Sequence, residues 1–177
     1  GGYFGSSTTL KFITFSGFER TYQAWNGVPR DSLSTNRTYN PAGEYTDRDG
    51  NLAYYKDQVD NYQQDHYQLI FSQKLAKKLT MNTAFHYTHG NGYYENYKED
   101  ESFGEYGLPD INLGDTVITH TDLVNRKMMD NHFYGLTFSG VWSISDRLGF
   151  ILGGAWNRYE GDHFGKVIWA EYASTGD

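Results

Sequence analysis

The chain has 177 residues, among them 16 Tyr, 11 Phe, 4 Trp, 20 Gly and no Cys. The missing cysteines exclude a disulfide-stapled module and a Cys-ligated zinc domain, and the aromatic content is too high for a disordered acidic tail. The 22 acidic and 15 basic residues give a net charge of -7, which argues against nucleic acid as a partner. No run of about 18 apolar residues occurs, so no transmembrane helix is expected.

Apolar residues recur at every second position along much of the chain, which is the period of a β-strand. In the stretch 79–88, one face would carry Leu79, Met81, Phe85 and Tyr87, and the other face would carry polar or small side chains. Four further stretches alternate in the same way. The sequence predicts strands at about residues 8–17, 66–75, 79–88, 132–143 and 147–158.

The second face of these strands consists of Gly, Ala, Ser, Thr and Asn, with almost no charge. Such a face suits the wall of a transmembrane barrel, with lipid on the apolar side and a lumen on the other. About ten residues at roughly 3.3 Å each, tilted by about 40°, rise about 25 Å, the height of the apolar band of an outer-membrane barrel. The predicted fold is therefore all-β, an antiparallel up-and-down transmembrane β-barrel segment of about five or six strands.

Short and long connections alternate along the chain. Residues 76–78 and 145–147 form tight links, whereas the predicted loops cover residues 18–64 and 89–131. In outer-membrane barrels short turns face the periplasm and long loops face outward. The sequence therefore predicts two long extracellular loops.

Both predicted loops are rich in Tyr, Asn and Gly, a composition typical of binding surfaces. Tyrosine buries a large area at low entropic cost and keeps a hydroxyl group for hydrogen bonding. The alternative is that these aromatic side chains pack the loops against each other. The candidate ligand-binding residues are Tyr22, Trp25, Tyr93 and Tyr94.

Signals for metal binding or catalysis are weak. His86 and His89 are three residues apart and would point to opposite faces of a strand, so joint ligation would need a bend. The segment 47–51 resembles the start of a calcium loop, but its twelfth position is Gln58, so a plain Asp-Gly turn is expected. No nucleophile elbow or catalytic triad is visible, and we predict neither an enzyme nor a resident metal or cofactor.

Several segments resemble the barrels of TonB-dependent outer-membrane receptors of Bacteroidetes-type bacteria. The similarity covers nearly the whole chain and begins at residues 19–29, with the sequence ERTYQAWNGVP. Further similar blocks occur in the same order, at residues 37–43, 60–67, 86–90, 92–95, 130–135 and 161–165.

The resemblance implies active nutrient uptake at the cell outer membrane. Such receptors form a 22-stranded barrel closed by a plug, capture a ligand with extracellular loops and are driven by the TonB complex. The implied partners are the rest of the barrel and the plug, the TonB complex, outer-membrane lipid and a small nutrient such as a ferric siderophore, haem or another metal chelate. The chain departs from the pattern because it shows no plug or TonB box and ends in Ala173–Asp177 without an aromatic residue. It is therefore expected to be a middle segment of a longer receptor.

Two alternatives stay open. One is a receptor of the same barrel family that imports a glycan or a peptide. The other is a soluble all-β carbohydrate-binding module with exposed Tyr and Trp, which would need a second sheet over its apolar strand faces. A complete eight-stranded barrel does not fit, because the two loops take about half of the chain and leave too few residues for eight strands.

Overall fold

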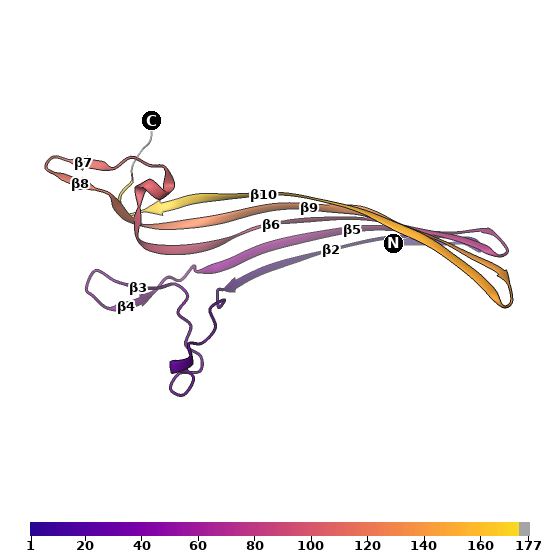
Figure 1. The fold of residues 1–177 in the computed structure, drawn as a ribbon, viewed down its shortest axis with the longest axis horizontal. Helices are drawn as coiled ribbons and strands as arrows, with labels where there is room; N and C mark the ends of the chain where they lie inside the picture. Colours follow the sequence, from indigo (N-terminus) through magenta and orange to yellow (C-terminus); the bar gives the residue numbers. More distant parts are fainter. Residues whose placement is uncertain (174–177) are drawn as a thin grey trace. The chain divides into compact units, whose positions relative to one another are not determined.

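The computed structural model describes residues 1–173, so positions 174–177 of the predicted non-aromatic ending lie outside the described residues. It confirms an all-β antiparallel chain. The main sheet has six strands in the order β1-β2-β5-β6-β9-β10. Figure 1 shows β2, β5, β6, β9 and β10 following one another in this order. Their bounds are Gly2–Phe4, Thr8–Tyr22, Val59–Ala76, Leu79–Ser102, His120–Ser145 and Leu148–Ala170. Among the described residues the sheet does not close on itself, since β1 and β10 are its two end strands.

Smaller elements lie in the connections between the long strands. β3 and β4 form one two-stranded sheet and β7 and β8 form another, and two short 3-10 helices complete the described structure. The strands β3 and β4 are Glu44–Thr46 and Leu52–Tyr54, and the strands β7 and β8 are Ile111–Leu113 and Thr116–Ile118. The helices η1 and η2 are Arg30–Ser32 and Phe103–Tyr106. No helix in this part of the chain is long and apolar enough to cross a membrane.

The structure places a strand at each of the five predicted positions, but the strands run much further than predicted. The predicted loops 18–64 and 89–131 are consequently too long, because β5 already begins at Val59, β6 continues to Ser102 and β9 begins at His120. The prediction followed the alternation of apolar side chains, which stops where both faces become polar. The backbone ladder continues there, because N–H and C=O groups pair regardless of the side chains that they carry.

The chain forms two compact units, and the long strands contribute residues to both. The first unit comprises Gly1–Phe18, Tyr62–Asn91 and Met129–Asp162. The second comprises Glu19–Asn61, Gly92–Met128 and the chain from His163 onward.

In the first unit the two faces of the strands differ as the sequence predicts. On one face the Ser72 hydroxyl donates to Asn82 Oδ1 at 2.7 Å, and Asn82 Nδ2 donates to Ser139 Oγ at 3.4 Å, so small polar groups link three strands. Because side chains alternate along a strand, the neighbours of these residues point the other way. The large apolar side chains exposed on β6, β9 and β10 include Met81, Phe85, Phe138, Trp142, Leu148, Phe150, Leu152 and Trp156.

In the part of the chain that the structure describes, the buried apolar side chains all lie in the second unit. They are Ala42, Val59, Phe103, Leu123 and Val124. Five buried apolar side chains form a small core for the second unit. Hydrogen bonds and ion pairs must therefore supply much of the stability of this unit.

Glycines permit a close approach of β9 to β10. A Cβ atom on Gly135 would lie 2.3 Å from the Trp156 carbonyl oxygen, whereas one on Gly140 of the same strand would lie 4.0 Å from the nearest neighbour, the Leu152 carbonyl oxygen.

We therefore expect Gly135→Ala to lower the free energy of unfolding by about 1–3 kcal/mol, because the added methyl group overpacks the strand pair. Gly140→Ala should change it by less than about 0.5 kcal/mol. Denaturant unfolding followed by tryptophan fluorescence compares the two variants, and equal effects would contradict a close approach at Gly135.

Candidate functional site

A buried carboxylate organises the second unit. Glu95 of β6 is 3% exposed, and its two carboxylate oxygens accept hydrogen bonds from the Tyr55 hydroxyl at 2.5 Å and from Arg126 Nε at 2.6 Å. A buried charge is tolerated only when it is paired and hydrogen-bonded, and both conditions are met here. Burial and the hydrogen bond to Glu95 raise the pKa of Tyr55 above its ordinary value, so the phenol remains a donor at physiological pH.

Two buried glutamines connect the strands beside this carboxylate. Gln23 Nε2 donates to the carbonyl oxygens of Val59 at 3.1 Å and Glu95 at 3.0 Å, which joins the end of β2 to β5 and β6. Gln58 Nε2 donates to Asn96 Oδ1 at 2.9 Å, and Gln58 Oε1 accepts from the backbone N–H of Tyr97 at 3.0 Å. These hydrogen bonds therefore fix both ends of the connection 23–58, which begins at Gln23 and ends at Gln58.

Of the four predicted ligand-binding residues, the structure brings Trp25 and Tyr94 together. Their rings meet edge to face, with centroids 5.1 Å apart and planes at 82°. Trp25 Nε1 donates to Asp60 Oδ2 at 2.9 Å, and the Lys127 ammonium lies 5.7 Å from the centre of the Tyr94 ring. Trp25 is 61% exposed, so this aromatic pair is accessible from solvent.

The other two predicted residues have different surroundings. Tyr93 precedes Tyr94 in β6, so the two side chains leave opposite faces of the strand. The Tyr93 ring packs against the Arg126 guanidinium, 4.1 Å from the ring centre. The Tyr22 hydroxyl donates to the carbonyl oxygens of Ala42 and Tyr55, at 2.9 and 3.0 Å, and so holds the first connection in place.

A cavity of about 540 Å³ in the second unit collects basic side chains from a chain that is acidic as a whole. Four cations, Lys98, Arg126, Lys127 and Lys166, line it together with one acid, Glu105. Arg126 is paired with Glu95 and Lys98 with Glu101. Asn125 also lines this cavity and is 9% exposed, yet its Oδ1 atom has no hydrogen-bond partner among the described residues. A buried acceptor without a donor costs free energy, so Asn125 Oδ1 can accept a hydrogen bond from a donor that enters the cavity, such as water or a hydroxyl group of a ligand.

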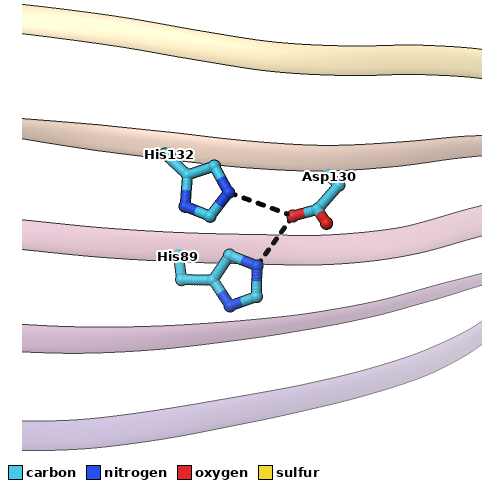
Figure 2. A group of neighbouring side chains, drawn as sticks. All are labelled: His89, Asp130 and His132. Carbon is cyan, nitrogen blue, oxygen red and sulfur yellow. Dashed lines mark hydrogen bonds and ion pairs between the residues drawn. The ribbon is translucent and has the colours of Figure 1, made fainter.

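The first unit contains a cluster of two histidines and an aspartate, shown in Figure 2. His89 extends from β6, and Asp130 and His132 extend from the neighbouring β9. His89 Nε2 lies 2.7 Å and His132 Nε2 lies 3.6 Å from the same Asp130 oxygen, Oδ1. The two imidazole rings are nearly parallel, with centroids 4.8 Å apart.

His86 and His89 have different partners in the structure, as expected for side chains on opposite faces of a strand. His86 Nε2 is 2.9 Å from Asn157 Oδ1, whereas His89 faces Asp130. The strand shows no bend that would turn both rings to one side. The Asp130-Asn131-His132 spacing already indicates a shared face, but the pairing of β6 with β9 was needed to bring His89 to it.

Asp47 forms a plain turn, as the sequence predicts. Its Oδ1 atom accepts from the backbone N–H groups of Asp49 at 3.0 Å and Asn51 at 2.8 Å, and Gly50 has a φ of 80°. The turn closes the β3–β4 hairpin.

Comparison of the chain with protein-family models, with curated proteins and with solved structures returned no match.

The Glu95 site generates a stability prediction. Glu95→Gln removes the charge that pairs with Arg126 and sets an amide N–H₂ against a neighbouring donor, so we expect the free energy of unfolding to fall by about 1–3 kcal/mol. The exposed Glu105 is the matched control, and Glu105→Gln should change stability by less than about 0.5 kcal/mol. Urea denaturation of both variants measures the difference. A Glu95→Gln protein as stable as the control would contradict the claim that the Glu95 carboxylate stabilises the second unit.

Proposed function

We propose that this chain is part of the wall and outer loops of a TonB-dependent outer-membrane receptor that imports a small nutrient. The observation that carries the proposal is the exposed apolar face of the first unit. Phe138 is 51% exposed, Trp142 51% and Leu152 65%, and they belong to neighbouring strands. Side chains of this size normally gather in a core, and a continuous exposed patch of them marks a surface that meets something apolar.

The large solvent-accessible area of the chain supports the proposal that the exposed apolar face meets lipid. The chain exposes 12551 Å², whereas a compact folded monomer of 20.3 kDa exposes about 8,800 Å². A barrel wall has this property, because its outer face meets lipid and its inner face meets the lumen. The small polar groups around Asn82 suit a lumen-facing side.

The connections support the same proposal. Two-residue turns join β5 to β6 and β9 to β10, while the intervening connections 23–58 and 103–119 are long and carry their own small sheets. Alternation of short and long connections is typical of outer-membrane barrels. We propose that the remaining strands of a 22-stranded barrel, the plug and the contact with the TonB complex belong to other parts of the same receptor.

A soluble carbohydrate-binding module has less support. It requires a second sheet over Phe138, Trp142 and Leu152, but both two-stranded sheets, β3–β4 and β7–β8, belong to the second unit. Among the described residues the first unit has only one sheet layer.

The basic cavity favours an anionic ligand over a neutral glycan. Lys127 and Lys166 supply positive charge beside one acidic side chain, Glu105. The unpartnered Asn125 Oδ1 is an acceptor, so it would take a hydrogen bond from a hydroxyl or N–H group of the ligand and does not itself recognise an anion. Ferric siderophores, haem and other metal chelates carry carboxylate or similar anionic groups, which charge-assisted hydrogen bonds recognise. Such a chelate is therefore the proposed nutrient.

The membrane-facing orientation can be tested by placing a charge on each face of β9. Phe138→Arg should reduce the free energy of folding into lipid vesicles by about 2–4 kcal/mol, because the charge would enter the middle of the bilayer. Thr137→Arg is the matched control on the opposite face and should cost clearly less. Equal costs, or a Phe138→Arg protein that stays folded and monomeric without detergent or lipid, would overturn the membrane proposal.

The aromatic pair can be tested by uptake in cells that carry the complete receptor. Alanine at Trp25 or Tyr94 should reduce uptake of the transported chelate about tenfold, equivalent to roughly 1.4 kcal/mol of binding free energy, because stacking area is lost. Tyr93→Ala is the comparison, since that ring packs against Arg126 on the other face, and its effect on uptake should be smaller. A panel of radiolabelled ferric siderophores and haem provides the measurement, and unchanged uptake would confine Trp25 and Tyr94 to packing.

A further inference from the structure

We propose that His89, Asp130 and His132 form a binding site for a divalent transition-metal cation, with Zn²⁺ as the representative ion. The inference rests on the first unit alone and does not depend on the proposed transport function. All three residues present a ligand atom on one face of two neighbouring strands (Figure 2).

The distances fit one shared ion after a small adjustment. The three ligand atoms lie within 4.8 Å of one another, and the two histidine Nε2 atoms lie 2.7 and 3.6 Å from Asp130 Oδ1. Zinc bonds of about 2.0–2.1 Å in tetrahedral geometry place ligand atoms about 3.3 Å apart. Shifts of about 1.5 Å or less bring the three atoms to this spacing, and the two nearly parallel imidazole rings must also rotate so that their lone pairs converge on the ion.

The donor types select the class of metal. Imidazole nitrogen is a good ligand for Zn²⁺, Ni²⁺ and Cu²⁺, whereas Mg²⁺ and Ca²⁺ prefer sites made of oxygen. Two imidazoles and one carboxylate are a recognised zinc ligand set in which a water molecule occupies the fourth position. The site is also accessible, because the side chains of His89, Asp130 and His132 are 26%, 50% and 41% exposed.

A neighbouring hydroxyl holds one of the ligands in position. The Tyr87 oxygen lies 2.8 Å from His132 Nδ1, on the side of the ring away from Asp130. In the tautomer that carries its proton on Nδ1, His132 donates this proton to Tyr87 and keeps the Nε2 lone pair free for a metal. Hydrogen bonds of this kind fix the tautomer and orientation of metal-binding histidines.

Metal binding would replace the present hydrogen bond between His89 and Asp130. His89 Nε2 now donates to Asp130, so this proton moves to Nδ1 by exchange with water when Nε2 takes the metal. The two parallel rings also rotate about their Cβ–Cγ bonds to converge on the ion. The bound cation then links β6 to β9, and it should stabilise the folded state because the unfolded chain has no preformed site.

The experiment is calorimetric titration of the whole chain, folded in detergent and free of any histidine tag, with zinc chloride. We expect one Zn²⁺ per chain and a higher midpoint of thermal unfolding in its presence. Asp130→Asn and His132→Gln keep the shape of the side chains and should weaken binding at least about tenfold, as should His89→Ala. Tyr87→Phe retains the ring but loses the hydroxyl, and such changes beside a metal ligand weaken affinity about 10–100-fold.

His86→Ala is the matched control, because His86 is on the same strand and faces Asn157. It should bind Zn²⁺ as the unchanged chain does, and circular dichroism shows whether each variant is folded. Titration with Co²⁺ adds a spectroscopic readout, since coordination by imidazole gives visible absorption bands that must disappear in Asp130→Asn. The proposal is overturned if the unchanged chain binds no Zn²⁺, if the folded ligand variants bind it normally, or if His86→Ala abolishes binding. In these cases the three residues are only a hydrogen-bonded surface cluster.

Discussion

The antiparallel backbone ladder is the constraint on which the rest of this structure depends. Only five apolar side chains are buried among residues 1–173, so a conventional core cannot account for the order of the long strands β5, β6, β9 and β10. β5, β6 and β9 instead satisfy their N–H and C=O groups by pairing with a strand on each side, and the end strand β10 pairs with β9. Once the ladder is formed, alternation sends successive side chains to opposite faces, and these faces can meet different surroundings.

The two units use this freedom in different ways. In the first unit one face of β6 and β9 carries exposed apolar side chains and, further along the same strands, the cluster of His89, Asp130 and His132. The other face carries small polar groups. The apolar part of the first face suits contact with lipid. In the second unit the interior is largely polar, and Glu95, Gln23 and Gln58 bind to backbone and side-chain groups of several strands. A satisfied polar network specifies one arrangement because every alternative leaves a buried group unpaired. The unpartnered Asn125 Oδ1 is the exception, and it lies where a ligand is proposed to bind.

The sequence was a good guide to the position of strands and a poor guide to their ends. Alternation of Leu79, Met81 and Phe85 identified β6, but residues beyond Gly90 are polar on both faces and carry no comparable pattern. The aromatic content of the loops was visible, yet it did not show that Tyr93 would pack against Arg126 while Tyr94 would meet Trp25. Strand alternation could have separated the two tyrosines, if β6 had been predicted to extend that far.

The sequence by itself determined the all-β class, the apolar and polar faces of the strands and the tight turns, because these depend on residues close together in the chain. Only the tertiary structure decided which distant residues meet. The pairing of β6 with β9, which a long connection separates in sequence, brings His89 to Asp130 and His132 and Glu95 to Arg126. Tyr55 reaches Glu95 from the connection between β4 and β5. The physical reason is that side chains alternate every two residues along a strand, which fixes the face on which each side chain lies. The residue that it meets on the next strand depends on the register between the two strands, and no local sequence pattern specifies that register.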